Sequence, residues 1–150
     1  MKKLLSILTL IVAVALSGCS AHNSGSKVKV FGTEPTIAES VSIASLNSEP
    51  AKFKDQDVLV TGKVIGMCMH SGCWVEIEQA DKSTVICKST DESVHFTPDV
   101  MGKNIELQGT LMWDENAPGE VEKEHEGEAP HACPAPKVMV SVKGARVKGI

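Results

Sequence analysis

Five short runs in this 150-residue chain alternate apolar and polar residues, and this period of two constrains the fold more than any other feature. The runs cover residues 57–66, 73–78, 83–88, 104–112 and 137–147. Because neighbouring side chains of a strand point to opposite faces of a sheet, each run is expected to be a strand with one buried face. The segments between them show no helical pattern long enough for the crossovers of a parallel sheet.

Three strands in succession, a connection and two further strands predict a mainly β fold, a small five-stranded barrel of the OB type. A sandwich-like sheet is the alternative. In the hairpin centred near Ala80, the pattern predicts Val75 opposite Val85 and Cys73 opposite Cys87. Ahead of the barrel, residues 36–39 fit a capping box, and residues 43–47 predict a short helix.

The N-terminal residues indicate where the protein works. A basic start, an apolar run over residues 4–16 and the sequence Leu-Ser-Gly-Cys ending at Cys19 resemble the signal peptide of bacterial lipoproteins. In such proteins the equivalent of residues 1–18 is removed and the cysteine carries acyl chains. We expect a lipid anchor facing the periplasm, and Ser20 after the cysteine favours the outer membrane. A signal cleaved without lipidation and an uncleaved helix are the alternatives.

Composition divides the rest of the chain into a tether and one domain. Residues 19–28 hold the lipidated cysteine and a small polar tether, and residues 29–150 form the domain. Removal of residues 1–18 takes away two lysines, so the formal net charge falls from −4 to −6. This charge argues against nucleic acid as a partner.

Soft metal ligands are concentrated between Met67 and Cys73, in the sequence Met-Cys-Met-His-Ser-Gly-Cys. Thiolate, thioether and imidazole suit Cu(I), and thiolate and imidazole suit zinc. At a turn between strands, Cys68 and Cys73 can chelate a metal, form a disulfide or remain buried thiols, and the spacing does not choose among these. Met67 and Met69 cannot both point inward, so at least one is expected to be exposed.

A second cluster lies in the long segment 114–136 between the last two predicted strands. It holds seven acidic residues against one lysine, and the sequence His-Ala-Cys follows them. In OB folds this loop and the loop after the first strand flank the binding face, so the two clusters are expected to meet. The predicted metal ligands are Cys68, Cys73, Cys133 and His131, with Cys87 or a methionine as a substitute. Cys87 fits equally well as a small apolar core residue.

Several short segments together resemble a known family. They are Phe31-Gly32, Val41-Ser42-Ile43, residues 50–53, residues 58–62, Cys68-x4-Cys73-Trp74, Phe96-x-Pro98 and Gly102. The pattern is similar to the domain-of-unknown-function 4920 family of small bacterial secreted proteins, and Gly72-Cys73-Trp74 is its most specific block. The resemblance implies an OB-like barrel in a lipoprotein or periplasmic protein, and it implies no activity. The acidic His/Cys-bearing segment and Cys87 depart from the family pattern.

These observations predict a non-enzymatic, lipid-anchored envelope protein that binds copper or zinc through Cys68 and Cys73, joined by Cys133 or His131. The alternative is a disulfide-stapled structural or envelope-assembly module that binds a peptide, a glycan or another envelope protein. A thiol oxidoreductase ranks third, because C-x4-C lacks the usual C-x-x-C geometry and such an enzyme needs an exposed cysteine of low pKa. The sequence contains no Ser-His-Asp grouping, phosphate loop or paired-carboxylate motif, so hydrolase and nucleotide chemistry have little support.

Overall fold

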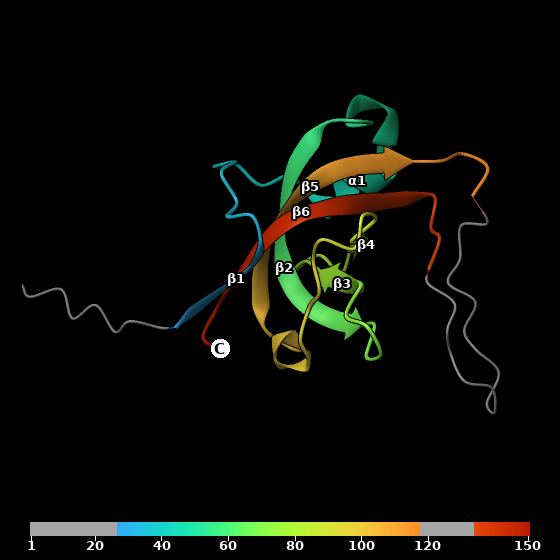
Figure 1. Ribbon diagram of the computed structural model, residues 1–150. Helices are drawn as coiled ribbons and strands as arrows, with labels where there is room; N and C mark the ends of the chain where they lie inside the picture. The colour runs from blue at the N-terminus through green and yellow to red at the C-terminus, as the bar shows by residue number, and fades with distance from the viewer. Residues whose placement is uncertain (1–26, 118–133) are drawn as a thin grey trace, which may run out of the picture.

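The computed structural model describes residues 27–117 and 134–150, in which five strands close into a barrel (Figure 1). The strands are β2 (Asp57–Met67), β3 (Trp74–Glu78), β4 (Thr84–Lys88), β5 (Asn104–Trp113) and β6 (Val138–Lys148). They pair in the order β2-β3-β4-β6-β5, and β5 returns to β2. The β4–β6 pairing is parallel and the other four are antiparallel. The predicted five-stranded OB-like barrel is confirmed.

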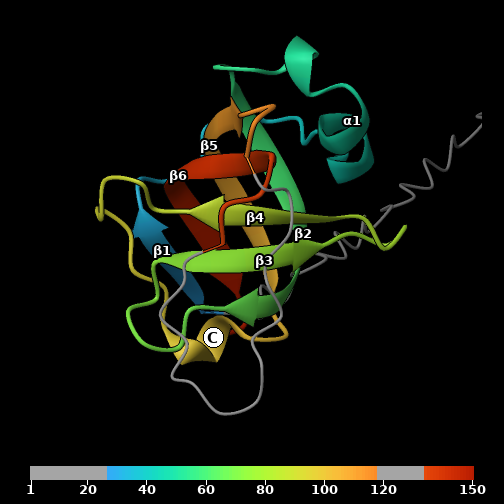
Figure 2. The same cartoon turned by 90° about the vertical axis from the view of Figure 1, so that its right-hand side faces the viewer.

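Four smaller elements surround the barrel: β1 (Val28–Gly32), α1 (Ile43–Ser48), η1 (Pro50–Lys52) and η2 (Pro98–Val100). The alternating pattern did not predict β1, which pairs antiparallel with the second half of β6. Figure 2 shows β3 and β4 side by side across one face, with α1 at one end of the barrel. Within the two described ranges, no helix has the length and apolar character to cross a membrane.

The helix starts later than the predicted capping box. Thr36 does not begin a helix, because the N–H groups of Thr36 and Ile37 donate to Oε1 of Gln108 at 2.7 and 3.0 Å. The short helix begins at Ile43, whose N–H donates to Oε1 of Gln79 at 2.9 Å. The Gln79 side chain therefore satisfies a donor at the start of α1, and the Gln108 side chain satisfies two donors of the extended segment before it.

The register of the β3–β4 hairpin also differs from the prediction. Val75 lies opposite Cys87, two positions later than expected, and the N–H of Ser89 donates to the carbonyl of Cys73 at 2.8 Å. The turn contains Lys82 at φ 69°, and its centre lies one position further along the chain than predicted. A shift of two keeps the same side chains facing the core, but it removes Cys87 from its expected place opposite Cys73.

The core is built from aliphatic side chains on the inward faces of the barrel strands. Alternation places nine residues on the inward faces of β2, β5 and β6. Val138 is only partly buried, and the other eight are buried: Val58, Val60, Val64, Ile105, Leu107, Leu111, Val140 and Val142. Phe31, Phe96 and the α1 residues Ile43 and Leu46 complete the cluster. Among the residues that the structure describes, the buried core residues all fall between residues 31 and 147, so a chain of residues 20–150 contains each of them.

The chain after β1 passes very close to β6 at Gly144. The N–H of Thr33 donates to the carbonyl of Lys143 at 3.1 Å. A Cβ atom added at Gly144 would lie 1.7 Å from the carbonyl oxygen of Thr33. Because the obstructing atoms belong to the backbone, no rotation of a side chain can relieve this clash.

We expect Gly144→Ala to lower the free energy of unfolding by about 2 kcal/mol or more, since the two chain segments must move apart. Urea denaturation of residues 20–150 measures this change. The matched control is Gly66→Ala, where the nearest atom is the flexible side-chain oxygen Oε2 of Glu76 at 3.3 Å. Equal stability of the two variants would contradict the close approach.

Candidate functional site at the β2–β3 turn

Cys68 and Cys73 lie at the two ends of the turn that joins β2 to β3. β2 ends at the buried Met67, and β3 begins at Trp74. The N–H of Cys68 donates to the carbonyl of Trp74 at 3.0 Å, and the N–H of Gly72 donates to the carbonyl of Cys68 at 2.9 Å. These bonds bring the ends of the turn together. Both cysteines are half-buried, so the pair remains accessible from solvent.

The segment after β4 braces this turn. Gly72 has φ 67°, and a Cβ there would lie 2.0 Å from the carbonyl oxygen of Phe96, so the position requires glycine. The N–H of Phe96 donates to the carbonyl of Gly72 at 2.8 Å, and Nδ1 of His95 donates to the carbonyl of Ser71 at 3.0 Å. Phe96 is buried against Phe31, with ring centroids 5.3 Å apart. The turn is therefore fixed to the core.

Several hydrogen bonds converge on Sγ of Cys68. The hydroxyl of Ser71 lies 3.3 Å away and the backbone nitrogen of Ser71 lies 3.5 Å away, and the Cys73 side chain also lowers the pKa of this thiol. Burial alone would raise the pKa of Cys68, but these bonds and one from the backbone of His70 outweigh it and lower the pKa from 9.0 to about 6. Cys68 is mainly a thiolate at neutral pH, the form that binds metals.

Cys87 lies in the core of the barrel. It is fully buried and pairs with Val75 on β3 and Val140 on β6. Burial raises the pKa of its thiol, which opposes formation of a thiolate. Cys87 therefore occupies the position of a small apolar residue, and the structure does not bring it into a metal-ligating group with Cys68 and Cys73.

The other predicted site residues lie outside the described residues. These are His131, Cys133 and the lipidation residue Cys19, together with the signal segment 1–18. In residues 27–117 and 134–150, no group of three or more His, Cys, Asp or Glu side chains is placed to hold a metal ion. The described part of the site thus supplies a pair of thiols, and the roles of His131, Cys133 and Cys19 stay predictions.

The methionines behave as predicted, because one is buried and the other is exposed. Met67 ends β2 with 8% of its surface exposed, whereas Met69 in the turn is 67% exposed. The thioether of Met69 is therefore a soft donor in solvent, adjacent in sequence to Cys68.

Sequence reasoning missed Ser71 and His95. The sequence offers no partner for His95, since its bond to Ser71 joins positions 24 residues apart. Ser71 lies inside the C-x4-C segment, and a hydroxyl next to the glycine of a turn is the one local signal that could have indicated it. The two residues act together. His95 bonds to the backbone carbonyl of Ser71, and the hydroxyl and N–H of Ser71 contact Sγ of Cys68.

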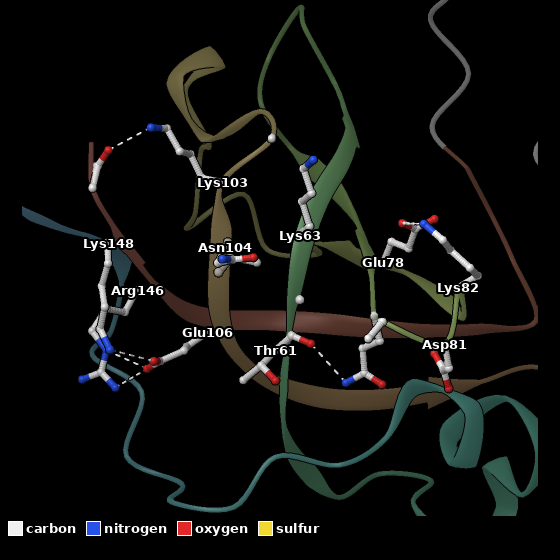
Figure 3. Close-up of a pocket in the computed structure, with 16 residues that line it drawn as sticks. Thr61, Lys63, Glu78, Asp81, Lys82, Lys103, Asn104, Glu106, Arg146 and Lys148 are labelled. Atoms are coloured by element: carbon white, nitrogen blue, oxygen red, sulfur yellow. Dashed lines mark hydrogen bonds and ion pairs between the residues drawn. The ribbon is translucent and has the colours of Figure 1, made fainter.

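A groove of about 1040 Å³ on the outside of the barrel is a second place where a ligand could bind (Figure 3). Its floor is formed by β2 and β5, and its charged side chains largely pair with one another, as in Lys82 with Glu78 and Arg146 with Glu106. Lys63 projects from the floor, and no ion pair to it occurs among the described residues. The described residues that line the groove include neither cysteine nor histidine.

Comparisons with protein-family models, with curated proteins and with solved structures find no match for this chain. The resemblance to the domain-of-unknown-function 4920 family therefore stays a prediction. Function has to be argued from the chemistry of the site, because a barrel of this kind serves many functions.

We expect the rate of alkylation of Cys68 by iodoacetamide to be half-maximal near pH 6 and to fall below it, because lower pH protonates the reactive thiolate. Ser71→Ala should move this midpoint up by about one pH unit, because a hydrogen bond to the thiolate is lost. Peptide mass spectrometry of residues 20–150 locates the modified cysteine and measures its rate.

Ser48→Ala, in α1, is the matched control and should leave the midpoint unchanged. Cys87 should stay unmodified in the folded protein, since it is fully buried. A midpoint for Cys68 near the ordinary 9.0 would show that the converging hydrogen bonds do not stabilise its thiolate.

Proposed function

We propose that this protein is a non-enzymatic, lipid-anchored envelope protein that binds a soft or borderline metal ion, copper or zinc, through Cys68 and Cys73. The observation that supports this most is the convergence of the two thiols at one braced turn, with Cys68 held as a thiolate. Metal binding requires deprotonated sulfur, so a stabilised thiolate reduces the competition from protons. The bracing by Phe96 and His95 limits the entropy lost when a metal fixes the pair.

The composition of the site favours Cu(I) over zinc. Structural zinc sites almost always have four protein ligands, whereas the described residues offer the two thiols. Cu(I) is selected by soft thiolate and thioether ligands, and the exposed thioether of Met69 adds a donor of this class. Zinc would need further ligands, for which His131 and Cys133 are the candidates.

An anchor at Cys19 would keep the metal site at the membrane surface. β1 begins at Val28, so residues 20–27 separate the anchor from the barrel. Eight residues span at most about 28 Å, which limits the barrel to a layer close to the membrane. The proposed place of the protein is the periplasmic side of the outer membrane.

We expect residues 20–150, in reduced form, to bind one Cu(I) in competition with a chromogenic Cu(I) chelator. Cys68→Ser and Cys73→Ser should each weaken binding by more than about 100-fold, because loss of a ligand exceeds the effect of losing an outer-shell partner. Affinity should also fall as the pH drops below about 6, where protonation of Cys68 competes with the metal.

Cys87→Ala is the control variant and should retain full Cu(I) affinity, since Cys87 lies in the core. The double variant His131→Ala/Cys133→Ser tests the remaining ligands by zinc and Cu(I) titration, and it should weaken zinc binding more than Cu(I) binding. Full Cu(I) affinity in the Cys73→Ser variant would overturn the proposal.

A further inference from the structure

We propose that Cys68 and Cys73 also form a thiol–disulfide exchange couple, which reduces a disulfide of a second molecule and closes into a disulfide of its own. The inference uses the same residues as the proposed function, and it deepens that function by adding an oxidised state of the site. It does not require the metal.

The first support is the position of the two cysteines at the ends of one closed turn. Backbone bonds of Cys68 to Gly72 and Trp74 hold the ends of the turn together, and the Cys73 side chain lies near enough to Cys68 to lower the pKa of its thiol. A disulfide needs its sulfurs about 2.05 Å apart. Because the two cysteines lie at the ends of one closed turn, the disulfide can form by movement within the turn, and the strands on either side can keep their pairing.

The second support is that the turn gives the two cysteines different roles. The hydroxyl and N–H of Ser71 both contact Sγ of Cys68. Cys68 is therefore the sulfur placed to attack, and Cys73 is the sulfur placed to resolve the intermediate.

The third support is the isolation of the couple from the remaining described cysteine. Cys68 and Cys73 are half-buried in a turn whose neighbour Met69 is 67% exposed, so a disulfide in solution can approach. Cys87 is fully buried in the core and cannot compete for the intermediate. Among the described cysteines, thiol–disulfide exchange is therefore confined to Cys68 and Cys73.

The reaction balances with a disulfide RSSR as the oxidant. The Cys68 thiolate attacks one sulfur of RSSR, which forms a Cys68–SR mixed disulfide and releases RS⁻. The sulfur of Cys73 then attacks Sγ of Cys68, its proton passes to the departing sulfur, and RSH leaves. The protein loses two electrons and one proton from its thiolate–thiol pair, and RSSR is reduced to RS⁻ and RSH.

This second state would control the metal site. A Cys68–Cys73 disulfide has no thiolate left to bind Cu(I), and a bound Cu(I) would occupy the sulfurs needed for exchange. The redox state of the turn therefore sets whether the protein can load metal.

The test uses residues 20–150 in a Cys133→Ser background, with oxidised glutathione as a small disulfide and insulin as a protein disulfide. Intact mass and peptide mapping follow the reduced, metal-free protein. We expect loss of two hydrogens with a bridge between Cys68 and Cys73, and no lasting glutathione adduct. Cys73→Ser should trap glutathione on Cys68, and Cys68→Ser should react at least about tenfold more slowly.

Cys87→Ala is the control and should react as the parent does. The relative rates with glutathione and insulin show which source of disulfide is preferred. The proposal is overturned if neither disulfide oxidises the pair, if the parent retains a glutathione adduct as Cys73→Ser does, or if the adduct forms on Cys73. Because this assay contains no metal, its failure would leave Cu(I) binding intact, and a failure to bind Cu(I) would leave the exchange result standing.

Discussion

The pairing of β5 with β6 closes the sheet, and the rest of the structure depends on this closure. β6 also pairs with β1 and, in parallel, with β4, so it joins the first and second halves of the chain. A closed barrel fills its interior with side chains and leaves its connecting segments as places for polar chemistry. Cys87 lies on β4 and is fully buried in the core, whereas Cys68 and Cys73 lie in a connecting turn.

The β2–β3 turn is held in place by the segment after β4 as well as by its own two strands. Phe96 is buried, and its backbone meets Gly72 so closely that only glycine fits there. This contact and the bond from His95 fix Ser71, which in turn stabilises the thiolate of Cys68. Metal binding and disulfide exchange both require two sulfurs held together in an accessible place, so one piece of local structure can serve both.

The sequence was sufficient to predict the strands of the barrel, but it was insufficient to predict the contacts that hold the β2–β3 turn in place. Alternation predicts the strands because each wall residue faces either the core or the solvent. It could not predict β1, whose partner strand is at the far end of the chain, or the register set by the backbone of Lys82. The C-x4-C spacing pointed to Cys68 and Cys73, but the contribution of His95 depends on a contact between separate loops.

The central claim is that Cys68 and Cys73 act as one paired site at the β2–β3 turn. X-ray absorption at the copper edge of Cu(I)-loaded residues 20–150 tests it most directly, because it identifies the atoms bound to the metal. The account predicts a first shell dominated by sulfur, which is lost in the Cys68→Ser/Cys73→Ser double variant. A nitrogen or oxygen shell that the double variant leaves unchanged would contradict it.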